Sequence, residues 1–300
     1  MYLRKIIRAL LPSFILNELR EYKRRKFNRN LSDALSTGNS IPLSTLTKQL
    51  EEMGIVKGDS LLVHASLRSM GFLEEGANTA IEALVNAVGE SGNILMPSSP
   101  VVSLQLDYLK GNPVFDSKAT PSRMGAISEN FRKLVGVKRS LHPTEPVCAL
   151  GSQADYLTEG HFNQLTPYNV NSPFYRLCEL KGKILYVGVT LANAGTSLHV
   201  LEDAVDFPYP VYHSEIFDLM LKDEMGELHH VKTKVHSPIY SKKRRCDDLI
   251  PLFIEKNACK RVRLGEAACL LFDADLMLTI MKEALILDGV TMYTPNGIKV

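Results

Sequence analysis

A histidine and a carboxylate lie three positions apart in residues 196–202, where the sequence is Thr-Ser-Leu-His-Val-Leu-Glu. Residues three apart share one face of a helix, so His199 and Glu202 can touch if this segment is helical. A carboxylate beside an imidazole orients the ring and raises its proton affinity, as a general base requires. The same spacing also fits an ordinary surface or capping pair, so the rest of the chain must decide between the two interpretations.

Three turns with small or polar residues could hold a ligand. Residues 63–71 follow a predicted strand, and ligands of open α/β sheets bind beyond the carboxyl ends of strands. Exposed amides there could bind phosphate or carbonyl groups, although an ordinary turn with a buried histidine fits as well. Residues 96–100 form a second turn, or a rigid loop. Residues 120–125 precede a helix, where either an anion beside Arg123 or simple capping by Thr120 or Ser122 is expected.

The elements that would position these residues alternate between apolar strands and amphipathic helices. The predicted strands are 60–64, 93–96, 146–150 and 183–189, and the predicted helices are 43–53, 76–88, 125–134, 172–180 and 196–205. This alternation is typical of an α/β protein whose sheet is at least partly parallel.

The pattern changes after residue 208. Residues 216–221 and 228–235 flank a turn at 223–226 and predict an antiparallel hairpin. Helices near 247–256 and 274–285 are expected on either side of a short strand at 266–271. A second subdomain could begin here, but no linker sets it apart.

Composition narrows the class of protein. The chain has 300 residues, of which 45% are hydrophobic and 23% charged, as in an ordinary globular protein with one large domain or two intimate ones. No apolar run approaches the roughly 20 residues of a membrane span. An odd number of cysteines without a CxxC pair predicts free thiols in a reducing cytoplasm. The five are Cys148, Cys178, Cys246, Cys259 and Cys269.

The net charge of +2 conceals a basic head. Residues 1–30 hold nine Lys/Arg and two Glu, a net +7, so the other 270 residues carry −5. Apolar residues recur at helical spacing between Ile6 and Leu19, and a basic run occupies 23–29. We expect residues 1–43 to be an extension and linker, with the main domain at 44–300. The head could pack on the body, mediate self-association or contact an anionic membrane surface. Nucleic-acid binding is not expected, because the charge is confined to this head.

Taken in order, several of these stretches resemble the aminoglycoside 3-N-acetyltransferase (antibiotic N-acetyltransferase) family. The matching stretches are residues 63–71, 89–97, 120–125, 139–143, 172–173, 188–189 and 196–202, within a likeness that spans about 44–290. The resemblance implies an α/β fold with a central mixed sheet flanked by helices and a smaller antiparallel element in the C-terminal third. It also implies an N-acyltransferase that takes acyl-coenzyme A as co-substrate, needs no metal, and acts on the amine of a sugar-like acceptor.

The resemblance assigns roles to residues. His199 is implied as the base and Glu202 as its partner, with Thr196 and Glu145 on the acceptor side. The residues implied to hold coenzyme A are His64, Ser66, Leu67, Arg68, Ser69, Met70, Ser122, Arg123 and Met124. Because the cysteines lie outside the matched catalytic segments, a cysteine-bound acyl intermediate is not expected.

Two departures bear on the acceptor. Glu145-Pro146 stands where resistance enzymes of the family tend to carry His-Ser, and residues 236–238 and 241–245 also differ. If the basic run 242–245 borders the pocket, it suits an anionic acceptor such as a nucleotide-linked sugar. We therefore favour N-acylation, by acetyl or a longer acyl group, of a nucleotide-linked amino sugar for surface polysaccharide. Aminoglycoside acetylation, conferring resistance, is the alternative.

Two other classes of function are less favoured. A metal hydrolase could use His199 and Glu202 with His64 or His142 as a third ligand, but the chain has no HExxH pattern, and His229-His230 stands in the predicted hairpin without acidic neighbours at ligand spacing. A degenerate, non-catalytic binding protein is disfavoured by the intact His199 and Glu202 pair.

Overall fold

The computed structural model describes residues 38–102 and 104–297, together with positions 15, 18, 21, 22, 25 and 36. The predictions for the basic head, including membrane contact and self-association, therefore fall almost wholly outside the described residues. Within the described part of the chain, every helix is too short or too polar to cross a membrane.

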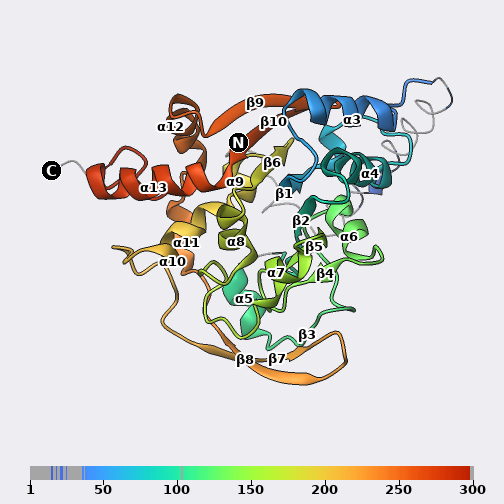
Figure 1. Ribbon diagram of the computed structural model, residues 1–300. Coiled ribbons are helices and arrows are strands. Elements are labelled where there is room, and N and C mark those ends of the chain that lie inside the picture. The colour runs from blue at the N-terminus through green and yellow to red at the C-terminus, as the bar shows by residue number, and fades with distance from the viewer. Residues whose placement is uncertain are drawn as a thin grey trace.

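A seven-stranded mixed sheet forms the centre of the molecule (Figure 1). Its strand order is β4-β5-β2-β1-β6-β10-β9. The three central strands are parallel: β1 (Ser60–Ala65) lies between β2 (Asn93–Pro97) and β6 (Lys183–Val187). The flanking strands are antiparallel: β4 (Lys138–Arg139), β5 (Val147–Gly151), β10 (Ala267–Asp273) and β9 (Cys259–Leu264). The turns after β1 and β2 consequently emerge side by side at one edge of the sheet.

Helices cover both faces of this sheet because side chains alternate along each strand (Figure 1). Leu61 and Val63 of β1 pack into one core with α3 (Leu43–Glu52), α4 (Ala77–Val88) and α6 (Ala126–Arg132). Leu62, pointing the other way, joins a second core. That core is covered by α7 (Ala154–Glu159), α8 (Pro173–Glu179), α10 (Val200–Ala204), α12 (Ile250–Glu255) and α13 (Ala274–Asp288).

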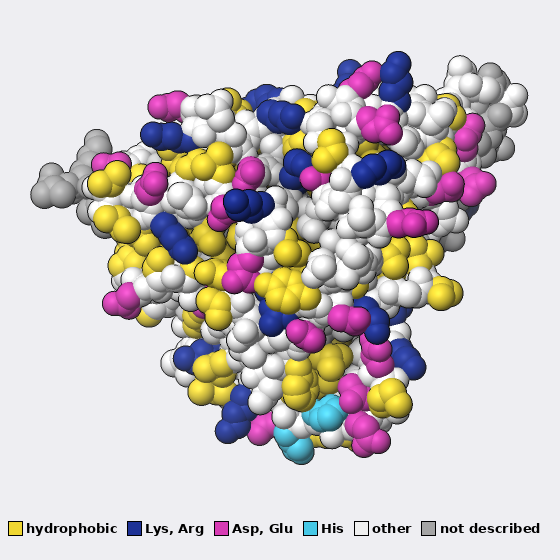
Figure 2. Space-filling view, viewed as in Figure 1, with side chains coloured by type: hydrophobic (Ala, Val, Ile, Leu, Met, Phe, Trp, Pro, Cys, Tyr) yellow, Lys and Arg dark blue, Asp and Glu magenta, His cyan; other side chains and the backbone are white. Residues whose placement is uncertain are grey.

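A second, three-stranded sheet lies at the lower end of the molecule in Figure 1. The predicted hairpin forms its β7 (Phe217–Lys222) and β8 (Leu228–Thr233), and β3 (Phe115–Asp116) pairs with β7 in parallel. A small core of its own includes residues of α5 (Gln105–Lys110). Strand β8 carries two histidines, His229 and His230. Figure 2 shows histidine side chains on the surface at this end of the molecule. The predicted hairpin is thus confirmed.

The suggestion of a separate subdomain after residue 208 is wrong, because β9 and β10 complete the central sheet. The predicted helix at 196–205 begins as a 3-10 turn, Thr196–His199, and continues as α10. The other short helices are η1 (Leu67–Ser69), α9 (Leu191–Ala194), α11 (Pro238–Lys243) and η3 (Cys246–Leu249).

Candidate active site

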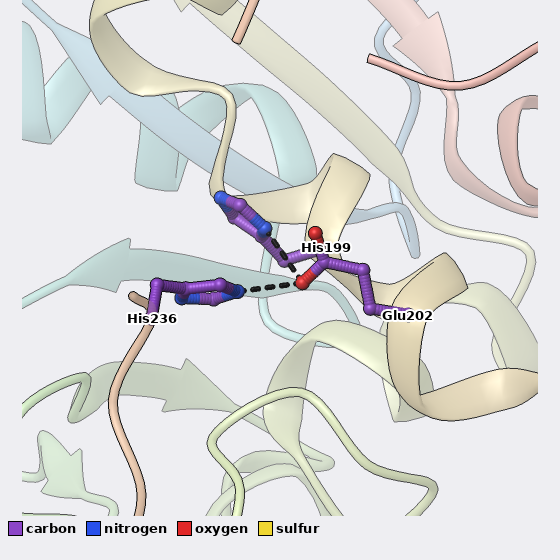
Figure 3. Close-up of side chains that lie close together, drawn as sticks. All are labelled: His199, Glu202 and His236. Atoms are coloured by element: carbon purple, nitrogen blue, oxygen red, sulfur yellow. Dashed lines mark hydrogen bonds and ion pairs between the residues drawn. The ribbon is translucent and has the colours of Figure 1, made fainter. Parts of the chain in front are cut away.

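His199 and Glu202 are in direct contact. Nδ1 of His199 lies 2.9 Å from Oε2 of Glu202, across one turn formed by the 3-10 segment and the start of α10 (Figure 3). Both side chains are buried. The neighbouring Leu198, Val200 and Leu201 pack into the core, which fixes the turn against the sheet. The spacing seen in the sequence therefore produces a rigid, buried pair and not a surface pair.

Glu202 accepts hydrogen bonds from two further side chains. Nε2 of His236, beyond β8, donates to Oε2 over 2.6 Å, so two imidazoles share one oxygen (Figure 3). The hydroxyl of Tyr293, beyond α13, donates to Oε1 over 2.6 Å. Burial alone would raise the pKa of Glu202, but the hydrogen bonds that it accepts from His199 and His236 hold the pKa below its usual range. Glu202 is therefore a carboxylate at neutral pH.

His199 is neutral in this environment. Burial lowers its pKa to about 3, although the charge of Glu202 acts in the opposite direction. With Nδ1–H donating to Glu202, the lone pair lies on Nε2, which has no hydrogen-bond partner among the described residues. The ring of Tyr168 stacks on the imidazole of His199, with 5.0 Å between the ring centroids. An oriented neutral imidazole with a free lone pair is the form that a general base needs.

His199 lines a cavity of about 300 Å³. Glu145 stands in the wall of this cavity and accepts a hydrogen bond from Nε2 of Gln105. Burial raises the pKa of Glu145 to about 7, against the hydrogen bond of Gln105 and the charge of Arg244. Arg244 lines the same cavity, so the basic run does border the pocket, but through one residue.

A second cavity of about 150 Å³ adjoins the first, and the two share Met124, Asn193, Ala194 and Thr196 as walls. His64 lines the second cavity and stacks on Tyr186 at 4.9 Å between centroids. Nε2 of His64 lies 3.3 Å from Oγ1 of Thr196, and burial lowers the pKa of His64 to about 3. Thr196 thus stands between the cavity of His199 and the cavity of His64.

The turn after β1 carries the first group of residues predicted to hold coenzyme A. Ser66 and Ser69 are half-buried, and their hydroxyl oxygens lie 3.0 Å apart. Gly188, after β6, faces them at φ +64°, and a Cβ there would lie 2.2 Å from Cβ of Ser69. This close approach admits only glycine.

The remaining side chains of this turn point in different directions. Arg68 is exposed, and Leu67 packs partly against the core. The Met70 side chain is buried in the core, and its carbonyl accepts a hydrogen bond from the amide of Glu266. The role of Met70 in holding coenzyme A therefore stays a prediction, which its buried thioether does not test.

The turn at 120–125 reaches the same region, since the position of a Cβ on Gly125 would be 3.8 Å from the carbonyl oxygen of Ala65. Neither Thr120 nor Ser122 caps α6, which begins after Gly125 without a side-chain cap. Oγ of Ser122 instead accepts from the amide of Met124.

The three residues predicted here for coenzyme A differ in exposure. The Ser122 side chain is buried and Arg123 is exposed. Of the three, Met124 lines both cavities.

Sequence reasoning missed several residues at the site. His236 and Tyr293 reach Glu202, Tyr168 stacks on His199, and Gln105 holds Glu145. Cys246 also lines the larger cavity, which the sequence did not lead us to expect. Burial raises the pKa of Cys246 to about 11, so it is a protonated thiol and a poor nucleophile. All five cysteines are free and buried, as predicted.

The histidines considered as a third metal ligand lie elsewhere. His64 contacts Thr196, and His142 stacks on His161 at 4.6 Å between centroids. The histidine beside His199 and Glu202 is His236. The potential metal-ligand atoms of these three residues lie within 4.8 Å of one another. In the hairpin, His229 contacts Asp223 and His230 contacts Asp218, two pairings that the sequence spacing did not indicate.

The seven-stranded mixed sheet, covered by helices on both faces, defines an α/β protein with two adjoining cavities that meet at Thr196. The chain belongs to the aminoglycoside 3-N-acetyltransferase family, whose model matches residues 62–286. This confirms the predicted family and the predicted α/β fold with a large mixed sheet and a small second sheet.

Curated relatives and solved structures carry related names. Aminoglycoside N(3)-acetyltransferase IV from Salmonella sp is 39% identical over 55% of this chain and 60% of its own length. Aminoglycoside N(3)-acetyltransferase III, also from Salmonella sp, is 28% identical over 78% of this chain and 87% of its own length. The match thus spans about three fifths of the first relative. Both are acetyltransferases, in agreement with the predicted enzyme class.

Among solved structures, an aminoglycoside acetyltransferase AAC(3)-IVa mutant in complex with a gentamicin has a TM-score of 0.70 and 28% identity. It covers 83% of this chain and 90% of its own. The YokD protein from Bacillus subtilis has a TM-score of 0.69 and 25% identity over 85% of this chain and 97% of its own.

Proposed function

We propose that this protein transfers an acyl group, acetyl by default, from acyl-coenzyme A to an amine of an aminoglycoside-type amino sugar. The observation that carries the proposal is the neutral His199, which is oriented by Glu202 and lines a cavity of about 300 Å³. That volume is at the lower end of the range for small-molecule pockets.

The chemistry needs one base and one set of oxyanion donors. An amino-sugar amine is mostly protonated at neutral pH, and its lone pair must be freed before it can attack. The ammonium first releases one proton to solvent. As the neutral amine attacks, Nε2 of His199 accepts a second proton from the nitrogen, and Glu202 stabilises the imidazolium that forms. The bound donor supplies a thioester carbonyl, whose carbon–sulfur bond breaks as the new carbon–nitrogen bond forms. His199 then returns the proton to the leaving thiolate.

The two cavities suit two substrates. We assign the acceptor to the cavity of His199 and Glu145, and the acyl end of the donor to the cavity of His64. Thr196 lies between them, where its hydroxyl can donate to the developing oxyanion. The turns at Ser66, Leu67, Arg68 and Ser69, and at Ser122, Arg123 and Met124, hold the rest of the donor in this proposal.

The acceptor class now differs from the one that the sequence favoured. The relatives are named as aminoglycoside acetyltransferases, and one solved neighbour is a complex with a gentamicin. These names favour aminoglycosides over nucleotide-linked amino sugars. One observation keeps the second class as a candidate: Arg244 places a positive charge in the acceptor cavity.

A thiol-release assay with acetyl-coenzyme A tests the proposal. Panels of aminoglycosides and nucleotide-linked amino sugars are compared for the wild type, for His199→Ala and for His230→Ala. His230 is the control because it lies exposed on the hairpin. We expect the wild type to turn over at least one acceptor, and we expect the rate to fall by about 10²–10⁴-fold in His199→Ala. The rate should stay unchanged in His230→Ala. Equal activity of the three proteins would refute the role of His199, and no release with any acceptor would refute the function.

A further inference from the structure

Arg244 is the residue of the basic run that enters the acceptor cavity. It follows α11 directly, and its side chain lines the cavity together with Glu145 and His199. Its neighbours behave differently. Lys243 is exposed, and Arg245 is exposed with an ion pair to Asp248 at 2.5 Å. The chain therefore directs one cation of this run to the site and leaves the adjacent ones in solvent.

The guanidinium of Arg244 has neutral partners only. One nitrogen donates to Oγ of Ser241 over 3.1 Å, and the group also interacts with the Tyr293 hydroxyl. Its Nε is buried and has no hydrogen-bond partner among the residues that the structure describes. No carboxylate in the described part of the chain lies within ion-pair distance, 4.0 Å, of it. A guanidinium left in this state is prepared to bind an anion with two parallel hydrogen bonds.

The rest of the cavity does not cancel this charge. His199 is neutral, and the other polar walls include Ser99, Gln105 and Asn193, which are uncharged. Among the described residues, Glu145 is the one carboxylate that lines the cavity. Glu202 does not line it and is in contact with His199. A cavity with one cation and one acid fits a ligand that carries one ammonium and one anion. A ligand with several ammonium groups meets repulsion from Arg244.

We propose that Arg244 determines acceptor specificity: it binds an anionic group, such as a phosphate, on an amino sugar whose amine faces His199, and it weakens the binding of polycationic acceptors. The inference rests on the proposed function for the assignment of this cavity to the acceptor of an acyl transfer, and it revises which amino sugars that cavity prefers. It predicts that aminoglycosides are poorer ligands than amino sugars that carry one anionic group.

Equilibrium binding tests the inference separately from catalysis. Isothermal titration calorimetry compares glucosamine with glucosamine 6-phosphate, which differ by the phosphate alone, on the wild type, Arg244→Gln and Arg245→Gln. We expect the phosphate to tighten binding about tenfold in the wild type and in Arg245→Gln, the order expected for a charge-assisted hydrogen bond. The difference disappears in Arg244→Gln, whereas gentamicin binds more tightly to that variant than to the wild type.

Other outcomes overturn the inference. They are equal affinity for the two sugars in the wild type, undetectable binding of both, or a phosphate preference that survives in Arg244→Gln. An equal loss of affinity for all three ligands in Arg244→Gln would also overturn it, and a raised KM for acetyl-coenzyme A alone would assign Arg244 to the donor. Arg244→Lys keeps the charge and should retain part of the preference, which separates charge from a folding defect. A phosphate preference without turnover would support this inference and refute the proposed function.

Discussion

The hydroxyl of Tyr293 donates a 2.6 Å hydrogen bond to Oε1 of Glu202, whose other oxygen accepts from His199 and His236. Tyr293 follows α13 and lies beyond the region, 62–286, that the family model matches. Thus a segment outside the matched region fixes the carboxylate that orients the proposed base. The pair in residues 196–202 is local in sequence, but its geometry depends on residues 34 and 91 positions away.

Removing this hydroxyl should weaken catalysis. In Tyr293→Phe the ring keeps its packing, but Glu202 loses a donor, and a hydrogen bond to a charged group is worth about 1.5–3 kcal/mol. We expect kcat to fall by about tenfold with KM for acetyl-coenzyme A unchanged, and the pH dependence of kcat to shift.

Steady-state kinetics between pH 6 and 9 check this. Tyr240→Phe is the matched control, because the Tyr240 ring lies 5.6 Å from that of Tyr293 and has no hydrogen bond to Glu202. A similar loss in both variants, or an unchanged pH profile in Tyr293→Phe, would argue that the hydroxyl is only structural.

Glu145 should make stability depend on pH. Burial raises its pKa from 4.5 to about 7, so between these values the folded state binds a proton that the unfolded state has lost. Stability therefore falls as pH rises through this window, by up to about 3 kcal/mol at pH 8. Glu145→Gln cannot ionise and should gain stability over the wild type at pH 8 relative to pH 4.5.

Urea unfolding at pH 4.5 and pH 8 measures the effect. Glu227→Gln, at an exposed position, serves as the control. Its free energy of unfolding should differ from that of the wild type by the same amount at both pH values. If the difference in unfolding free energy between Glu145→Gln and the wild type is also independent of pH, Glu145 is ionised throughout this window.

The central strands and the His199–Glu202 pair could be predicted because their signals are local. Strand β2 is buried along its whole length, and such a strand appears as a continuous apolar run. Strand β9 was missed since it is an edge strand with Lys260, Arg261 and Arg263 in it, which conceals the apolar pattern. The burial of the Met70 thioether in the core could not be foreseen, because Met70 stands in a turn of small and polar residues that resembles a ligand site. The contacts of His236 and Tyr293 with Glu202 leave no mark in the sequence, because tertiary packing alone brings them together.

His64 should destabilise the protein in mild acid. Its pKa in the folded state is about 3 because of burial, well below the ordinary 6.5, so the unfolded state binds a proton first as pH falls. Stability is lost below pH 6.5 at about 1.4 kcal/mol per pH unit, or about 2 kcal/mol at pH 5. His64→Asn removes this loss. The unfolding free energy of the variant should therefore lie below that of the wild type by a smaller amount at pH 5 than at pH 7.

Chemical denaturation at the two pH values tests this, with His230→Asn on the exposed hairpin as the control. A deficit of His64→Asn that stays constant between pH 7 and pH 5 would show that His64 takes up its proton equally in both states.

Gly188 should control the turn that we assign to the acyl donor. A Cβ at this position would lie 2.2 Å from Cβ of Ser69, so Gly188→Ala must displace the turn that contains Ser66 and Ser69. Overpacking of this kind costs about 1–3 kcal/mol. Gly76 is the matched control, because it has a similar φ of +60°. No atom of the described residues lies within 4 Å of the position that a Cβ would take there, so Gly76→Ala carries the backbone strain alone.

We expect Gly188→Ala to unfold at lower urea concentration than Gly76→Ala and to raise KM for acetyl-coenzyme A several-fold, while KM for the acceptor stays constant. The kinetic difference arises because the displaced turn borders the donor side in our assignment, whereas the acceptor cavity is built from other segments. A raised KM for the acceptor alone would place the donor elsewhere, and equal KM values for both substrates in the two variants would remove this turn from the site.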